Sequence, residues 1–134
     1  MKPCVLYFSR TRNTNRLAEA ISESIEAPAF DIAVSEPSVV ENFDLLILGT
    51  PVEGSRPAKE ASAFIERLPK AEDKKTILFC TYALWKGRTF NILKKGLSRK
   101  GYTIIIDVSK KGMKPDKPAD FSEIINKIKK SLQK

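Results

Sequence analysis

The chain of 134 residues contains no histidine. This absence excludes a histidine general base, Ser-His-Asp and Cys-His nucleophile systems, and the commonest zinc sites. Histidine is the side chain whose ordinary pKa lies closest to neutral pH. We therefore expect any redox or group-transfer chemistry of this chain to come from a bound cofactor.

Cysteine is also scarce, with only Cys4 and Cys80 in the chain. Both lie in predicted strands, and two cysteines are too few for a disulfide scaffold. Cys4 and Arg10 have the spacing of a tyrosine-phosphatase loop, but the residues between them form an apolar strand rather than an amide-rich loop. We therefore predict that Cys4 is a small core residue and that the chain is a reduced, cytoplasmic protein.

Long hydrophobic runs are absent as well. The longest are short strand candidates such as residues 45–48, which cannot span a bilayer. The apolar stretch near the N-terminus covers only residues 4–8, so export is not expected. Hydrophobic residues still make up 42% of the chain, which is typical of a folded protein. The length predicts a single domain over residues 1–134.

Acidic side chains are scarce in the C-terminal part of the chain. Residues 86–134 carry 14 basic and 4 acidic side chains, a net charge of +10, whereas residues 1–85 carry 10 basic and 12 acidic ones, a net charge of −2. This asymmetry indicates a basic face and a negatively charged partner, with solvated lysines as the alternative. Nucleic acid is not the expected partner, because the basic residues lack a recognition helix or interleaved aromatics.

The chain does contain a regular alternation of two patterns. Five short runs rich in β-branched or aromatic residues are predicted strands, and three of them are apolar on both faces, as in a parallel sheet covered by helices. The predicted strands are residues 4–8, 29–32, 45–49, 76–80 and 102–106.

Amphipathic helices are predicted between and after these strands, from apolar residues three and four positions apart. The four stripes begin at Leu17, Ala61, Phe90 and Phe121, and the third helix is expected to end at Gly101. Residues 33–43 are expected to hold at most a helical turn. Strict alternation of strands and helices predicts an α/β fold, a doubly wound five-stranded parallel sheet of order 2-1-3-4-5 with helices on both faces.

Ligands of such sheets bind beyond the carboxyl ends of the strands, here after the first, third and fourth strands. The loop after the first strand, residues 9–14 (loop 9–14), reads Ser-Arg-Thr-Arg-Asn-Thr and directly precedes a predicted helix. Hydroxyls, backbone amides and two arginines at a helix N-terminus form a natural phosphate site. Plain helix capping by Asn13 or Thr14 is the alternative.

Loop 9–14 resembles the phosphate loop of the flavodoxin family, Thr/Ser-x-Thr-Gly-x-Thr. The resemblance implies that its hydroxyls and amides hold the terminal phosphate of flavin mononucleotide (FMN). The residues concerned are Ser9, Arg10, Thr11, Arg12, Asn13 and Thr14. Arg12 stands where the family usually has glycine. Because arginine does not readily adopt a positive φ, we expect a different geometry at this position.

Two further loops extend the resemblance. Residues 48–54 look like the flavodoxin loop beside the isoalloxazine ring, and residues 80–87 look like the loop that commonly supplies an aromatic stacking partner. Tyr82 and Trp85 are the stacking candidates, although Tyr82 could instead lie in the core. The cofactor-binding residues implied are Thr50, Pro51, Val52, Glu53, Gly54, Thr81, Tyr82, Ala83, Leu84, Trp85 and Gly87.

The resemblance implies electron transfer through non-covalent FMN, without a metal or side-chain catalysis. An acidic redox partner protein is expected from the basic face of this chain. In flavodoxins a glycine-containing peptide rotates to meet the proton that the flavin gains on reduction, and Gly54-Ser55 falls in the matching place. A flavodoxin-like binding module that has lost flavin, and a small FMN-dependent reductase, are the alternatives. A phosphorelay receiver is excluded, because Ser9 and Thr50 follow strands that would need acidic metal ligands at their ends.

Basic residues are expected around the ring, where the family often has acidic or neutral groups. Arg56, Lys86 and Arg88 flank its predicted position. The same basic face is expected to include Lys94, Lys95, Arg99, Lys100, Lys110 and Lys111. Such a face would select an acidic partner.

Overall fold

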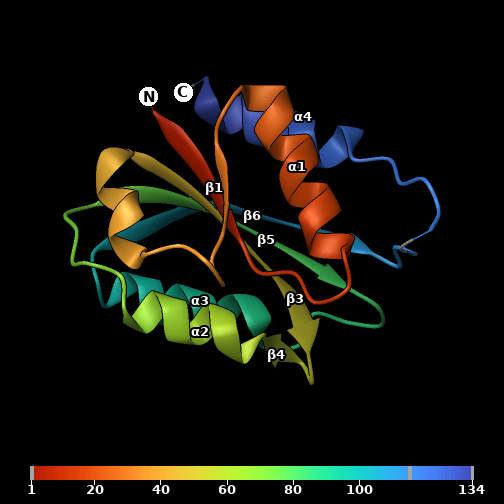
Figure 1. Cartoon of the computed structure of the whole chain (residues 1–134), viewed down its shortest axis with the longest axis horizontal. Coiled ribbons are helices and arrows are strands. Elements are labelled where there is room, and N and C mark those ends of the chain that lie inside the picture. The colour runs from red at the N-terminus through yellow and green to blue at the C-terminus, as the bar shows by residue number, and fades with distance from the viewer. Residues whose placement is uncertain (1, 115, 134) are drawn as a thin grey trace.

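The computed structural model describes residues 2–114 and 116–133, and its centre is a sheet with helices on both faces (Figure 1). Five parallel strands follow the order β2-β1-β3-β5-β6, which confirms the doubly wound order expected from the sequence. The strands are β1 (Pro3–Tyr7), β2 (Ala29–Asp31), β3 (Leu45–Glu53), β5 (Lys74–Tyr82) and β6 (Tyr102–Lys111).

A sixth strand was not predicted. The two-residue β4 (Arg56–Pro57) pairs antiparallel with the end of β3 and forms a hairpin beyond the main sheet. In Figure 1 this hairpin projects from the end of β3. A strand of two residues has no periodicity, so its sequence pattern could not indicate it.

The four predicted helices are confirmed. Figure 1 shows α1 (Asn13–Ile25) and α4 (Ser122–Leu132) on one side of the sheet, and α2 (Lys59–Glu66) and α3 (Thr89–Ser98) on the other. The turn expected within residues 33–43 is a 3-10 helix, Pro37–Asn42. Among the helices that the structure describes, none has the length and apolar character needed to cross a membrane.

The core consists of two apolar layers, one on each face of the sheet. On β1, Cys4 and Leu6 pack with the α2–α3 layer, whereas Val5 packs with the α1–α4 layer. This alternation explains why the central strands are apolar at every position. Cys4 and Cys80 are buried free thiols, and desolvation raises the pKa of each to about 12. Cys4 is therefore a core residue rather than a nucleophile.

Strand β6 extends five residues beyond its predicted end at Ile106. Its pairing with β5 shifts register between Thr76 and Ile77, so that Ile105 is the extra residue of a bulge. Ile104 consequently packs with the α2–α3 layer and Val108 with the α1–α4 layer. The interrupted alternation hid the second half of this strand in the sequence.

Candidate functional site

A cleft of about 390 Å³ lies at the carboxyl edge of the sheet. The residues around it come from the ends of β1, β3, β5 and β6, as the rule for doubly wound sheets predicts. Its lining consists of Arg10, Thr11, Asn13, Pro51, Val52, Glu53, Thr81, Tyr82, Ala83, Gly112, Met113 and Lys114. The structure thus brings together residues from all three loops that the sequence singled out.

Loop 9–14 enters α1 through a left-handed residue, Arg12, with φ 76° and ψ −13°. The expectation that arginine would change the geometry here is wrong, because Arg12 adopts a conformation normally favoured by glycine. Its carbonyl accepts the backbone N–H of Arg16 at 2.9 Å, which begins the helix. A left-handed non-glycine residue costs roughly 1–2 kcal/mol, a strain that the rest of the loop must offset.

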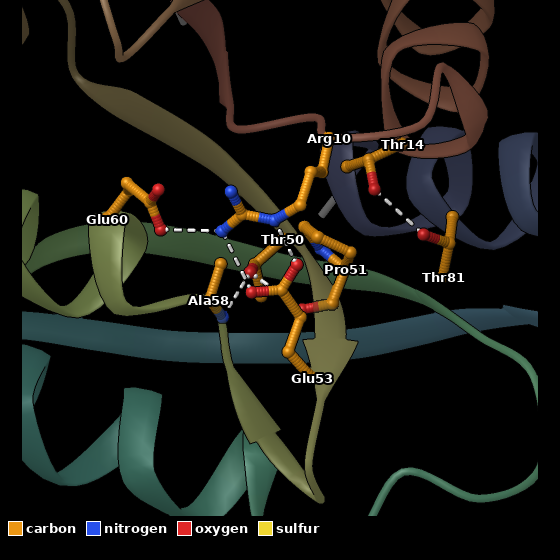
Figure 2. Close-up of polar contacts among 8 residues, drawn as sticks. All are labelled: Arg10, Thr14, Thr50, Pro51, Glu53, Ala58, Glu60 and Thr81. Atoms are coloured by element: carbon orange, nitrogen blue, oxygen red, sulfur yellow. Dashed lines mark hydrogen bonds and ion pairs between the residues drawn. The ribbon is translucent and has the colours of Figure 1, made fainter.

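The polar side chains of loop 9–14 have different roles. Ser9 Oγ accepts the backbone N–H of Asn15 at 3.1 Å, so Ser9, and neither Asn13 nor Thr14 of the capping alternative, satisfies this amide in the first turn of α1. Thr14 is buried, and its hydroxyl lies 2.7 Å from that of Thr81 at the end of β5 (Figure 2). Thr11 is exposed and lines the cleft, which makes its hydroxyl accessible to a ligand.

Asn13 connects loop 9–14 to the segment after β6. Its side-chain amide donates to the carbonyl of Met113 at 3.2 Å. Its Oδ1 is buried and has no hydrogen-bond partner within residues 2–114 and 116–133. Buried acceptors are nearly always satisfied in native proteins, so this atom indicates a missing donor.

The β3–β4 hairpin has a tight two-residue turn. Gly54 (φ 59°) and Ser55 (φ 66°) are both left-handed and lie between the paired residues Glu53 and Arg56. Positive φ at both central positions is the signature of a type I′ turn. A Cβ added at Gly54 would meet no atom within 4 Å, so the turn is open to solvent on that side.

The tip of this hairpin is fixed to the loop after β5. The carbonyl of Ser55 accepts the backbone N–H of Arg88 at 2.8 Å. Gly87 is left-handed (φ 57°), and a Cβ there would lie 2.6 Å from the Ser55 carbonyl oxygen. Gly87 therefore permits the close approach of the two loops and does not itself line the cleft.

Thr50, another predicted site residue, is buried and serves the fold. Its hydroxyl donates to the carbonyl of Pro51 at 2.9 Å and accepts the backbone N–H of Ala58 at 3.0 Å (Figure 2). Ala58 directly precedes α2. Both hydrogen-bonding functions of the hydroxyl are thus used inside the chain, between β3 and the start of α2.

The two aromatic candidates differ in position. Tyr82 is half-buried and lines the cleft, whereas Trp85 lies outside the lining with 65% of its surface exposed. Leu84 is 82% exposed and also lies outside. Tyr82 is therefore the aromatic side chain that the structure brings to the cleft.

The sequence interpretation missed the residues that follow β6, namely Gly112, Met113 and Lys114. They reach the cleft because β6 is parallel to β5 and pairs Lys111 with Tyr82, so both strands end at the same edge. The rule that ligands bind beyond the carboxyl ends would have included this segment if the end of β6 had been placed correctly.

The basic residues do not form the single face that we expected. Lys110 and Lys111 end β6 at the cleft edge, whereas Arg99 and Lys100 precede its start. Ten strand residues span about 30 Å, so these two groups lie at opposite ends of the sheet. Lys94 pairs with Asp107 at 2.7 Å, and Lys100 donates to the carbonyl of Leu68, also at 2.7 Å. Part of the positive charge is therefore neutralised or used in the fold.

Arg10 joins three elements across the cleft rim (Figure 2). Its Nε and Nη2 donate to the two carboxylate oxygens of Glu53 at 2.5 and 2.9 Å, and Nη2 also donates to Glu60 at 2.8 Å. These hydrogen bonds raise the pKa of Arg10, and the hydrogen bond from Arg10 is the main cause that lowers the pKa of Glu60. In residues 2–114 and 116–133, no group of His, Cys, Asp or Glu side chains is arranged to hold a metal ion.

Comparison with known proteins finds a matching family and solved structures of the same fold. The family model described as a flavodoxin domain matches residues 4–100. A flavodoxin of Clostridium beijerinckii is 30% identical over 109 residues, which cover 75% of this chain and 79% of that protein. An uncharacterised protein of Methanocaldococcus jannaschii is 28% identical over 115 residues, which cover 84% of this chain and 76% of that protein. The crystal structure of oxidised flavodoxin 2 from Bacillus cereus has a TM-score of 0.81 at 18% identity, with 99% of each chain covered.

Proposed function

Because the chain belongs to the flavodoxin family, whose role is electron transfer on a bound flavin, we propose that its flavin is FMN, bound in the cleft at the carboxyl edge of the sheet. The observation that carries this proposal is the convergence of loop 9–14, the β3–β4 hairpin and the loop after β5 on that one cleft. The cleft volume lies in the range of small-molecule sites. The chain itself needs no catalytic side chain for such a role.

The phosphate of FMN fits the end of the cleft formed by loop 9–14. The first amides of α1 have no partner within the helix, and the helix dipole places partial positive charge beside them. Thr11 adds an exposed hydroxyl, and the exposed Arg12 adds a cation. Together these groups offer the donors and the charge that a phosphate requires.

The ring and sugar parts of FMN fit the remaining lining. Pro51, Val52 and Tyr82, which all line the cleft, supply apolar and aromatic contact for a flat ring. The Oδ1 of Asn13, which has no partner among the described residues, would accept a hydrogen bond from a hydroxyl group of the ribityl chain. When bound, FMN supplies the redox chemistry. The chain binds it, orients it and excludes water from one face.

The Gly54-Ser55 peptide is proposed to rotate with the redox state. Rotation of the central peptide converts a type I′ turn into a type II′ turn, in which only the first central residue keeps a positive φ. Ser55 would thereby leave its strained left-handed conformation. Gly54 supplies the glycine that type II′ needs at the first central position. The carbonyl of Gly54 would change direction while the hairpin strands stay in place.

A binding module that has lost flavin is a weaker interpretation. A phosphate loop with a different geometry at Arg12 would favour such a module. Arg12 holds the left-handed conformation, and the turn into α1 is complete. That argument against FMN is therefore removed. The redox partner is proposed to be acidic where it meets the cleft, since Lys110, Lys111 and Lys114 lie at this edge.

The proposal is tested by titrating the apoprotein with FMN and with riboflavin, which lacks the phosphate. FMN should bind much more tightly. Thr11→Ala should lose a hydrogen bond to a charged group, roughly 1.5–3 kcal/mol, and should weaken FMN about tenfold or more. Thr11→Ser keeps the hydroxyl and should bind FMN nearly as well as the wild type. Equal affinity of the wild type for the two ligands would contradict the phosphate assignment.

A further inference from the structure

The Arg10 cluster (Arg10, Glu53 and Glu60) crosses from one functional loop to another. Arg10 belongs to loop 9–14, Glu53 ends β3 directly before the turn, and Glu60 lies in the first turn of α2. The Nε and Nη2 contacts to Glu53 form a bidentate pair of 2.5 and 2.9 Å. Figure 2 shows the guanidinium between the two carboxylates. Glu53 and Glu60, which lie 43 and 50 positions after Arg10 in the sequence, are thus held to loop 9–14 by one side chain.

The Arg10 guanidinium also stacks on the ring of Phe8. Its central carbon lies 4.9 Å from the centroid of the Phe8 ring, which is itself buried. An arginine that stacks on an aromatic ring and donates to a carboxylate through two nitrogens has a fixed orientation. The pairs are partly exposed, with 46% of the Arg10 side chain accessible. Their main effect is therefore positional, since exposed ion pairs add little stability.

The same contacts leave Arg10 unsuited to bind a phosphate. Two carboxylates surround one guanidinium, so the cluster carries a net negative charge. An additional anion would be repelled there unless it displaced Glu53 or Glu60. Arg12 presents the opposite case, because among the described residues it makes no ion pair and is exposed. Of the two arginines in the loop, Arg10 lines the cleft and Arg12 does not, but Arg12 is the one that has no carboxylate partner among the described residues and can meet an anionic ligand.

The hairpin has two fixed points, one on each side of its turn. Arg10 holds Glu53 before the turn, and the backbone N–H of Arg88 holds the carbonyl of Ser55 after it. The Gly54-Ser55 peptide lies between these points. An arrangement of this kind fixes the place of the hairpin and leaves the central peptide free to change orientation.

We propose that Arg10 is a positioning residue that holds the β3–β4 hairpin against loop 9–14, and that it affects the binding of the flavin ring and not of the phosphate. The inference rests on the proposed FMN site and assigns a role to this chain's own ion-pair cluster there. It predicts that the two arginines of the loop act on different parts of one ligand.

The first experiment uses the apoprotein and therefore does not depend on flavin binding. Amide hydrogen exchange of Arg88 reports the bond to the Ser55 carbonyl at the hairpin tip. Arg10→Ala should accelerate this exchange at least severalfold. Lys94→Ala is the matched control. It removes an ion pair with a similar N–O distance and similar side-chain exposure, Lys94–Asp107, whose residues do not line the cleft. The control should leave the exchange of Arg88 unchanged.

The second experiment compares two ligands. Arg10→Ala should weaken FMN and riboflavin by the same factor, so that the preference for FMN is preserved, whereas Thr11→Ala should weaken FMN alone. Arg10→Lys should behave like Arg10→Ala, since an ammonium cannot reproduce the planar, two-nitrogen contact. Glu53→Gln in the Arg10→Ala background should add almost nothing to either effect.

Two results would overturn the proposal. A loss of preference for FMN over riboflavin in Arg10→Ala would make Arg10 a phosphate ligand. Unchanged exchange of Arg88 in that variant would make the cluster a solvated ion pair without influence on the hairpin. If the wild type bound neither ligand, the proposed FMN site would fail, and the exchange experiment would still decide whether Arg10 positions the hairpin.

Discussion

Arg12 and Ser55 both adopt left-handed backbone conformations that glycine would adopt without strain. They precede, respectively, the helix proposed to bind phosphate and the strand that closes the hairpin. Strained residues persist where the surrounding structure determines the backbone, and they are concentrated at functional sites. Arg12 and Ser55 lie at the proposed FMN site, whereas the other two left-handed non-glycine residues described, Glu26 and Asp73, lie at the end of α1 and before β5.

Arg12→Gly separates the two contributions of Arg12. The substitution removes about 1–2 kcal/mol of backbone strain but adds about 0.4–1 kcal/mol of unfolded-state freedom, so the free energy of unfolding should change little or rise slightly. FMN affinity should fall about two- to fivefold, because in a water-like dielectric a unit charge about 4–8 Å from another contributes about 0.5–1 kcal/mol. Thermal unfolding of the apoprotein and FMN titrations at low and high salt provide the measurements.

The salt dependence gives the control for this substitution. FMN binding to Arg12→Gly should depend less on salt than binding to the wild type, since one screened attraction is missing. Arg12→Lys keeps the charge and should retain the wild-type salt dependence. An identical salt dependence in all three proteins would show that Arg12 has no electrostatic role.

At the scale of elements, the sequence predicted the central sheet and its four helices because their apolar periodicities are strong. It could not predict β4, which is too short for a period, or the second half of β6, which follows a bulge. The position of the candidate cleft was predicted through the ends of three strands and the resemblance of their loops. The Arg10 cluster was not predictable, because no local pattern connects Arg10 with Glu53 or Glu60.

The β3–β4 hairpin allows a prediction on its turn. Gly54→Ala permits the observed type I′ turn at a modest cost, because alanine can adopt the left-handed conformation, but it disfavours type II′, which needs glycine at this position. The rotated peptide should lose about 1 kcal/mol or more relative to the observed one, roughly a fivefold change in population. The yield of neutral one-electron-reduced flavin in a reductive titration should fall accordingly.

A second substitution tests the same turn from the other side. Ser55→Gly removes the left-handed strain of the observed type I′ turn. It should also lower the yield of neutral one-electron-reduced flavin, because it stabilises the type I′ turn and does not disfavour the type II′ turn. An unchanged yield in Gly54→Ala would mean that the peptide does not rotate or that another peptide does.

At the scale of the whole molecule, charge is divided between two ends of the sheet. Arg56 and Arg88 adjoin the hairpin tip, and Lys86 lies beside Lys110 and Lys111 in a neighbouring depression. Lys95 lies in the last turn of α3 and Arg99 directly follows that helix, at the opposite end of the sheet. Lys86 with Arg88 near the hairpin, and Lys95 with Arg99 at the opposite end, form two pairs of equal charge at different distances from the proposed flavin.

Lys86 and Arg88 should raise the potential at which the flavin accepts its second electron, because cations stabilise the anionic fully reduced form. At about 8 Å in a water-like dielectric, each unit charge contributes about 0.5 kcal/mol before screening by salt. The double variant Lys86→Glu, Arg88→Glu changes the charge by four units. A tenfold change in equilibrium corresponds to about 59 mV for one electron, so its potential should fall by some tens of millivolts. The control Lys95→Glu, Arg99→Glu has the same charge change and should shift it much less. Equal shifts in the two double variants would mean that net charge, and not the basic residues beside the cleft, sets the potential.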